Sequence, residues 1–151
     1  MARKAHGTCV QPVQQILRFG CDRAEADRIC CFERHDAELI GYAFSPKVTW
    51  LEQIIYRPNA STTITDYYDS VTGKRVFKAP VGRTLEEFIR ESQAHGWPSF
   101  RDNEVDWDNV RILGNGEVVS IDGTHLGHNL PDDKGNRYCI NLVSIAGYPT
   151  T

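Results

Sequence analysis

Residues 136–145, with the sequence NRYCINLVSI, alternate between two kinds of side chain. Successive side chains of an extended strand point to opposite faces of a sheet, so the alternation predicts a strand whose two faces differ. One face is mostly apolar and packs on a core; its side chains are Tyr138, Ile140, Leu142 and Ser144. The other places a thiol beside a permanent positive charge and an amide, and its side chains are Arg137, Cys139, Asn141 and Val143. We interpret this second face as the candidate site of a thiol enzyme.

The chain from residue 62 onward has the character of antiparallel β-structure. Residues 62–68 are rich in β-branched and aromatic side chains, which favour strands. The sequence GNG at residues 114–116 predicts a hairpin turn. Further short strands are expected over residues 76–77, 110–113, 117–121 and 138–144. This pattern predicts a mainly β protein of the α+β class.

One well-defined helix is predicted near residues 84–95. Thr84 and Glu87 have the spacing of a capping box, in which each side chain accepts the backbone N–H of the other residue. Apolar residues then follow at helical spacing, and Gly96 ends the helix because glycine readily adopts the left-handed conformation.

Residues 1–61 differ from the rest of the chain. Residues 11–45 are predicted to be helical, because apolar residues recur at helical spacing and Asp22 can cap a second helix. Residues 46–61 are expected to be irregular and to wrap the core. We therefore expect a single domain over residues 1–151, with residues 1–61 forming an N-terminal arm.

The composition is that of a globular protein. The 151 residues suffice for one domain with a sizeable core, and 40% of them are hydrophobic. The formal net charge is −3 without a large block of one sign, which argues against nucleic acid or an anionic membrane as the main partner. No apolar run follows the charged start, so neither a signal peptide nor a membrane span is expected.

The cysteines are odd in number and two of them are adjacent; they are Cys9, Cys21, Cys30, Cys31 and Cys139. Both features argue against the disulfide framework of a small secreted protein. A reducing compartment is favoured instead. We expect a cytoplasmic location, with an organelle as the alternative.

Cys139 lies close in sequence to groups that activate thiols. Nearby positive charge favours the thiolate, and Arg137 is two residues away on the same predicted face. His125 and His128 can transfer protons near neutral pH, and Asn141 can hydrogen-bond a substrate or a water. These residues predict nucleophilic chemistry at the thiol.

Two other interpretations fit the same residues. Cys139 can be a small buried hydrophobic residue, and the two histidines can belong to a polar turn. Alternatively, His125, His128 and Cys139 can supply three zinc ligands, completed by Asp122 or Asp132. Their spacing alone leaves these alternatives open.

Several motifs in order add information that spacing lacks. They are residues 96–100 (GWPSF), 125–128 (HLGH), 131–132 (PD) and 135–141 (GNRYCIN). This series resembles the motifs of the B-class methionine sulfoxide reductases, the MsrB or SelR family, over about residues 62–147. The resemblance implies a fold with two small antiparallel sheets of the β-tent type, N-terminal helices and one helix near residues 84–95. It also implies that residues 62–147 form the catalytic core.

The resemblance implies reduction of peptide-bound methionine-R-sulfoxide to methionine. Cys139 would attack the sulfoxide sulfur as a thiolate, and His125 and His128 would assist protonation of the sulfoxide oxygen. Methionine would then leave, and the cysteine would remain as a sulfenic acid. The expected partners are oxidised proteins bearing methionine sulfoxide, and a monomer is expected.

The same resemblance assigns binding roles to other residues. Asn141 and Arg137 would orient and tune the site, and Trp97 would form an apolar wall for the substrate methyl group. Asp132 matches an acid that supports a histidine, although a turn residue before Gly135 is the alternative. The remaining tryptophans are expected in the core: Trp50 and Trp107.

The chain departs from the family pattern at two places. Many members bind a structural zinc through two Cys-x-x-Cys pairs, and the corresponding positions here are Asp69, Thr72, Val119 and Asp122. We therefore expect neither a metal nor another cofactor. A common position for the resolving cysteine, two residues before Trp97, is occupied by His95.

Recycling of Cys139 is expected to come from elsewhere. Cys30 and Cys31 are candidate resolving cysteines in the arm, and a buried helical pair is the alternative for them. A thioredoxin or a small thiol can also reduce the sulfenic acid directly. Two non-catalytic functions stay open: a binding module that keeps the reductase fold, and a redox sensor in which Cys139 pairs with an arm cysteine.

Overall fold

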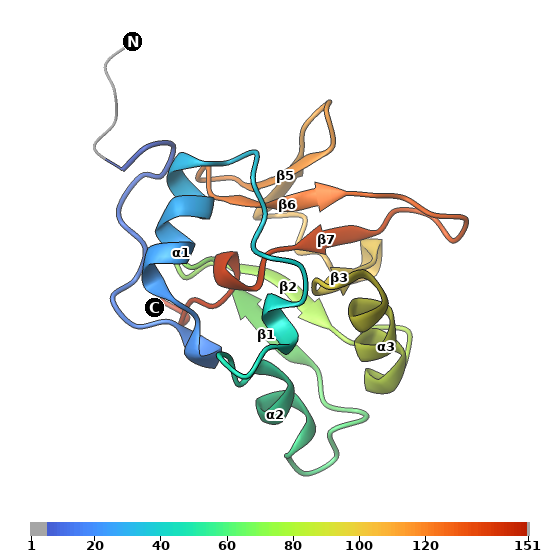
Figure 1. Cartoon of the computed structure of the whole chain (residues 1–151). Helices are drawn as coiled ribbons and strands as arrows, with labels where there is room; N and C mark the ends of the chain where they lie inside the picture. Colours follow the sequence, from blue (N-terminus) through green and yellow to red (C-terminus); the bar gives the residue numbers. More distant parts are fainter. Residues whose placement is uncertain (1–5, 151) are drawn as a thin grey trace.

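The computed structural model describes residues 6–150, which build two antiparallel sheets (Figure 1). The small sheet pairs β1 (Thr65–Tyr68) with β2 (Arg75–Ala79). The large sheet has five strands in the order β3-β7-β6-β5-β4. Their bounds are Ser99–Phe100 for β3, Val110–Ile112 for β4, Glu117–Ser120 for β5, His125–Asn129 for β6 and Tyr138–Ile140 for β7. The predicted α+β class with two small antiparallel sheets is confirmed.

The strand that carries Cys139 is shorter than predicted. β7 ends at Ile140, and Leu142–Ser144 form a 3-10 turn, η5. The reason lies in the arm, since the Glu38 carboxylate accepts the backbone N–H groups of Leu142 and Val143 at 2.9 and 3.1 Å. These donors are therefore not available to a neighbouring strand.

The partner strand β6 was not predicted, because its sequence HLGHN contains no β-branched residue. It forms by pairing on both sides, with β5 and with β7. Strand pairing, a tertiary effect, thus overrides weak local preference and places both histidines of the HLGH motif on a strand.

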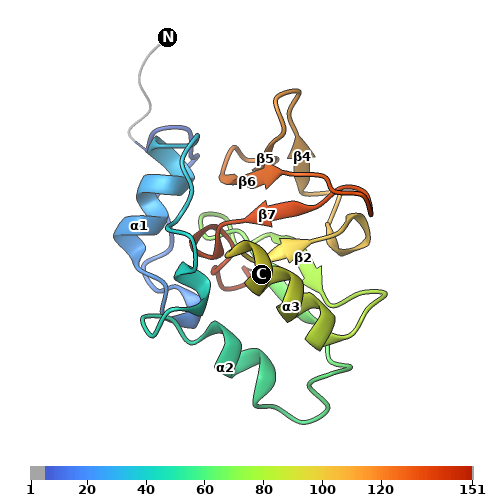
Figure 2. The ribbon, with the colours of Figure 1, turned by 45° about the vertical axis from the view of Figure 1, so that its right-hand side comes forward.

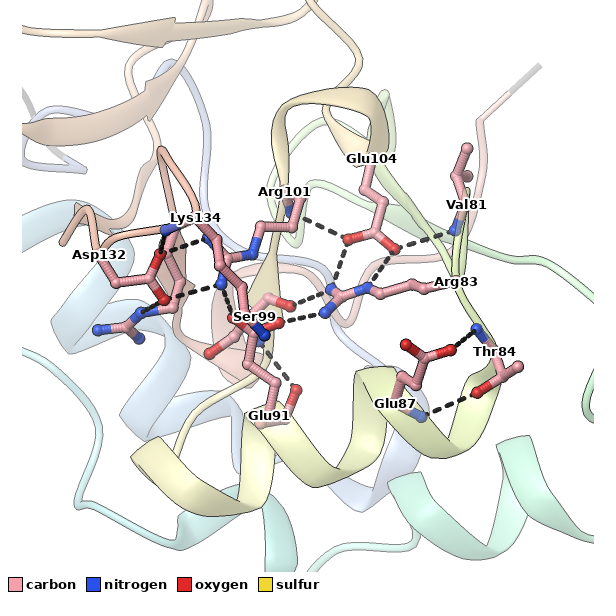
Figure 3. Close-up of polar contacts among 12 residues, drawn as sticks. Val81, Arg83, Thr84, Glu87, Glu91, Ser99, Arg101, Glu104, Asp132 and Lys134 are labelled. Atoms are coloured by element: carbon pink, nitrogen blue, oxygen red, sulfur yellow. Dashed lines mark hydrogen bonds and ion pairs between the residues drawn. The ribbon is translucent and has the colours of Figure 1, made fainter.

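The predicted helix near residues 84–95 is confirmed as α3 (Leu85–His95). Thr84 Oγ1 accepts the Glu87 N–H at 3.1 Å and the Glu87 carboxylate accepts the Thr84 N–H at 3.0 Å, so the capping box is complete (Figure 3). Gly96 ends the helix with φ 87°, a left-handed conformation that suits glycine. The chain then enters β3 directly, so α3 fixes the position of the GWPSF motif.

The N-terminal arm differs from its prediction. Its helical pieces are short: η1 (Arg18–Gly20), α1 (Arg23–Asp27), the π-helical turn η2 (Arg28–Phe32), η3 (Tyr42–Phe44) and α2 (Trp50–Ile55). The helix expected from residue 11 is wrong, because backbone N–H groups there bond to distant segments. Gln14 donates to the Ser70 carbonyl at 2.9 Å, and Arg18 donates to the Ala146 carbonyl at 2.6 Å.

The arm nevertheless supplies N-terminal helices, as expected. Asp22 caps α1, as predicted, by accepting the Ala24 N–H at 2.8 Å. The irregular structure expected over residues 46–61 is wrong where α2 forms. Figures 1 and 2 show the arm, in blue and cyan, running along one side of the molecule. None of the helices in residues 6–150 has both the length and the apolar character of a membrane-spanning segment. The charged start, residues 1–5, lies outside the described residues.

An aromatic cluster joins the small sheet, α2, α3 and β3. Its members are Trp50, Tyr67, Phe77, Phe88 and Phe100. The Trp50 indole N–H donates to the Tyr67 hydroxyl at 2.9 Å, which satisfies a polar group inside this core. The core position predicted for Trp50 is confirmed. The same prediction for Trp107 is wrong, because that side chain is 45% exposed.

Cys9 and Cys31 form a disulfide that the cysteine pattern did not predict. It ties the start of the arm to the end of η2 across 22 residues. The free cysteines of the described chain are Cys21, Cys30 and Cys139, all buried. The disulfide lies just before the arm segment that reaches the candidate site.

Candidate active site

Cys139 lies in the middle of β7, between two strands that both carry motif residues. Across the sheet its register partners are Ser99 on β3 and His128 on β6. The motifs GWPSF, HLGH and RYCIN therefore meet because β3, β7 and β6 are adjacent in the large sheet. The fold brings together residues that are about forty positions apart in sequence.

The Cys139 sulfur is in direct contact with a guanidinium. Arg137 Nη1 donates to Cys139 Sγ at 2.6 Å, and Ser99 Oγ lies 3.9 Å from the same sulfur. Burial raises the pKa of the thiol, while the Arg137 charge and the hydrogen bonds from Ser99 and Arg137 act against this rise. The predicted thiol–guanidinium pair is thus formed, and an arginine that donates to sulfur stabilises the thiolate.

A small pocket opens beside the sulfur. Its volume is about 70 Å³, enough for a few non-hydrogen atoms. It is lined by Ala37, Trp97, Gly127, His128, Leu130, Cys139 and Asn141. Four predicted site residues therefore share one pocket, which combines an apolar wall, an imidazole, an amide and a thiol.

His125 does not line this pocket. Its side chain is 0% exposed, with Nδ1 2.8 Å from a Glu117 carboxylate oxygen and Nε2 3.1 Å from the Asp36 carbonyl oxygen. Arg34 binds the same Glu117 carboxylate at 3.1 and 3.3 Å. Burial lowers the pKa of His125, and the Glu117 carboxylate opposes that effect. The centroids of the two histidine rings lie 5.4 Å apart. His128 lines the pocket, and His125 packs against it.

The arm segment 36–38 crosses the site and binds two pocket residues. The Glu38 N–H donates to Asn141 Oδ1 at 2.9 Å, and the Glu38 carbonyl accepts the Trp97 indole N–H at 3.1 Å. Asn141 Nδ2 also donates to the Leu126 carbonyl at 3.1 Å. The orientation of both Trp97 and Asn141 thus depends on the arm.

Glu38 is itself buried, and burial raises the pKa of its carboxyl group to about 8. The backbone N–H groups of Leu142 and Val143 counteract this rise by bonding to the charged form. Sequence reasoning missed the contributions of Arg34, Asp36, Ala37, Glu38 and Glu117. Much of the arm's contribution is made by backbone atoms, which leave no side-chain pattern in the sequence.

Asp132 contacts an arginine and not a histidine. Its two carboxylate oxygens accept hydrogen bonds from Arg101 at 2.9 Å each. Its backbone exchanges hydrogen bonds with Gly135, at 2.9 and 3.1 Å, which is the turn that was the alternative for this residue. The support expected from Asp132 comes to His125 from Glu117 instead.

The arm cysteines Cys30 and Cys31 have partners other than Cys139. Cys31 is bonded to Cys9, and Cys30 Sγ lies 3.4 Å from the Ser144 hydroxyl. Burial raises the pKa of Cys30 strongly, which makes its thiolate scarce. Within residues 6–150, neither sulfur forms a disulfide or hydrogen bond with Cys139.

The four positions that correspond to zinc cysteines belong to a polar cluster and a strand. Asp69 accepts the Val71 N–H at 2.8 Å and the Thr124 hydroxyl at 2.9 and 3.0 Å, and Lys74 pairs with Asp122 at 3.1 Å. The described part of the chain contains no group of three or more His, Cys, Asp or Glu residues placed to hold a metal. His125, His128 and Cys139, the ligands of the alternative zinc site, do not make such a group.

Comparison with known proteins shows a partial similarity. No family model matches the chain. The peptide methionine sulfoxide reductase MsrB of Methanosarcina mazei is 41% identical over 61 aligned residues; the match covers 33% of this chain and 43% of that protein. The chain thus spans less than half the length of this curated relative. Over that part it is similar to a methionine sulfoxide reductase.

Proposed function

We propose that the protein is an oxidoreductase that reduces the R epimer of peptide-bound methionine sulfoxide at Cys139. The observation that carries the proposal is the contact of Arg137 with the Cys139 sulfur at the edge of a pocket lined by Trp97 and His128. The partial similarity to a peptide methionine sulfoxide reductase supports the same chemistry.

In the proposed reaction, the Cys139 thiolate attacks the sulfoxide sulfur. The sulfoxide oxygen takes a proton, and His128 is the donor because it lines the pocket while both nitrogens of His125 are engaged by the protein. The substrate sulfur gains two electrons and leaves as a thioether. The S–O bond of the substrate breaks as the oxygen passes to the Cys139 sulfur, so Cys139 loses two electrons and becomes a sulfenic acid.

Substrate binding is proposed for the other pocket residues. Trp97 gives the methyl group an apolar contact, and Asn141 orients the oxygen or a bound water. Arg137 stabilises the attacking thiolate. His125 positions His128 and the chain around it. Asp132 acts through Arg101 and not through a histidine.

The recycling step is proposed to use an external dithiol, with thioredoxin as the expected reductant. One thiol attacks the Cys139 sulfenic acid and releases water, and the second thiol displaces Cys139 while the reductant becomes a disulfide. The engagement of Cys30 and Cys31 elsewhere supports direct attack by the external thiol over an internal resolving cysteine.

The proposal is tested with each epimer of a peptide methionine sulfoxide and dithiothreitol as reductant. We expect loss of the R epimer only, abolished in Cys139→Ser and retained in the control Cys21→Ser, which replaces a free cysteine outside the pocket. Loss of both epimers, of neither, or full activity in Cys139→Ser would contradict it. A second series with thioredoxin and its reductase tests the recycling step.

A further inference from the structure

Arg101 connects several groups next to the thiol site. It binds both oxygens of the Asp132 carboxylate at 2.9 Å each (Figure 3). Its Nη1 also donates to the Asn136 carbonyl at 3.1 Å. Its Nη2 pairs with Glu91 of α3. A bidentate arginine–carboxylate pair is geometrically well defined, so Asp132 is firmly held. Arg101 is therefore bound to the backbone of Asn136, the residue that precedes Arg137.

Asp132 stands between two guanidinium groups. Arg137 Nε lies 3.9 Å from Asp132 Oδ2, too far for a hydrogen bond, although this nitrogen is buried and has no partner within residues 6–150. Arg137 is 8% exposed and is directed through Nη1 at Cys139. A nearby carboxylate with free oxygens would attract this guanidinium away from the sulfur. Arg101 binds both oxygens and compensates the Asp132 charge, which weakens this competition.

We propose that Arg101 is a positioning residue of the thiol site. By holding Asp132 and the Asn136 carbonyl, it keeps the Arg137 guanidinium directed at the Cys139 sulfur. The inference concerns thiolate formation and rests on the proposed function only for its effect on catalysis.

Other charged groups also face Cys139. Glu91 on α3 disfavours the thiolate, and its pairing with Arg83 and Arg101 compensates its charge (Figure 3). His128 is opposite on β6, and its protonated form would favour the thiolate. Removal of Arg101 thus has two effects of the same sign, since it frees Asp132 and uncovers part of the Glu91 charge.

The experiment measures the rate of Cys139 alkylation by iodoacetamide as a function of pH, with peptide-resolved mass spectrometry to separate it from the other cysteines. In Arg101→Gln we expect the apparent pKa of Cys139 to rise by about one unit, which lowers the rate at pH 7 about tenfold. The control is Arg90→Gln, an exposed arginine in the same surface hollow, for which we expect an unchanged profile.

The double variant Arg101→Gln/Asp132→Asn tests the route of the effect. If Arg101 acts through Asp132, neutralising the freed carboxylate returns the Cys139 profile towards that of the wild type. A double variant that keeps the full shift would overturn the inference. So would an unchanged profile in Arg101→Gln whose thermal unfolding matches the wild type.

Arg101→Lys covers the case in which the glutamine variant does not fold. Lysine keeps the charge but cannot bind both oxygens in a fork, so we expect a smaller rise in the Cys139 pKa. The proposed role would be contradicted if folded Arg101→Lys kept the wild-type pH profile of alkylation while Arg90→Gln raised the apparent pKa of Cys139. Alkylation needs no sulfoxide, so a shift without reductase activity would refute the proposed function and leave this inference intact.

Discussion

The buried Glu38 predicts a pH dependence of stability that one substitution removes. Burial raises the pKa of its carboxyl group from 4.5 to about 8 in the folded protein. A group whose pKa is raised by folding stabilises the fold below its unfolded pKa, and this contribution is lost as the pH rises through the folded pKa. Glu38 should therefore reduce the free energy of unfolding progressively between about pH 4.5 and about pH 8.

The magnitude follows from the two pKa values. Each unit of pKa corresponds to about 1.4 kcal/mol, so the difference between 4.5 and about 8 corresponds to about 5 kcal/mol. Glu38→Gln resembles the protonated carboxyl group and keeps one acceptor, but its amide points a donor at a backbone N–H. That mismatch costs about 1–3 kcal/mol at every pH. The variant should be the less stable protein at pH 5 and the more stable one at pH 9.

Urea unfolding at pH 5, 7 and 9 measures this difference between the variant and the wild type. Comparison at each pH cancels the groups common to both proteins, including Asp69, whose pKa burial also raises. Glu52→Gln, an exposed glutamate of α2, is the control and should give a constant difference over this range. Parallel pH curves for the wild type and Glu38→Gln would refute the reasoning.

Three further outcomes are expected. In Gly127→Ala the new Cβ would lie 2.1 Å from the Cys139 carbonyl oxygen, so β6 and β7 must separate; thermal unfolding should show a loss of about 1–3 kcal/mol, and reductase activity should fall. Glu117→Gln removes the carboxylate that binds His125. Because the fold lowers the pKa of Glu117, this carboxylate should stabilise the protein above about pH 4.5 and lose its effect in acid; urea unfolding of wild type and variant at pH 3 and 7 measures the difference. Trp97→Phe keeps an apolar wall but loses the N–H bonded to the arm, so KM for the peptide should rise more than kcat falls in steady-state assays.

The parts of the site that were predictable lie on single continuous segments. Alternation in one strand predicted that Arg137 and Cys139 share a face, and the structure places them in contact. The capping box of Thr84 and Glu87 and the terminal Gly96 predicted α3, because these signals act within one turn of helix. Interactions between neighbouring residues are sufficient to predict the structure where a residue's partners lie close to it in sequence.

The unpredicted parts depend on partners far along the chain. Leu142 and Val143 leave the strand because a carboxylate about a hundred residues away accepts their N–H groups. His125 Nε2 is bonded to the backbone carbonyl of Asp36, an acceptor that any residue type provides. Asp132 was expected beside a histidine, but the position of Arg101 on a different segment decided its partner. Spacing within a motif contains no information on such contacts.

The crossing of the site by residues 36–38 bears on where this chain can be cut. The segment with recognisable motifs begins near residue 62, yet a chain that started there would lack the partners that Glu38 gives to the Trp97 indole N–H, to Asn141 Oδ1 and to the two backbone N–H groups after it. Water would replace these partners, so the direct loss is the fixed orientation of Trp97 and Asn141 beside Cys139. We therefore expect the smallest active unit to extend into the arm, and a truncation series should lose reductase activity before residue 38 is reached, because Arg34 and Asp36 bind Glu117 and His125.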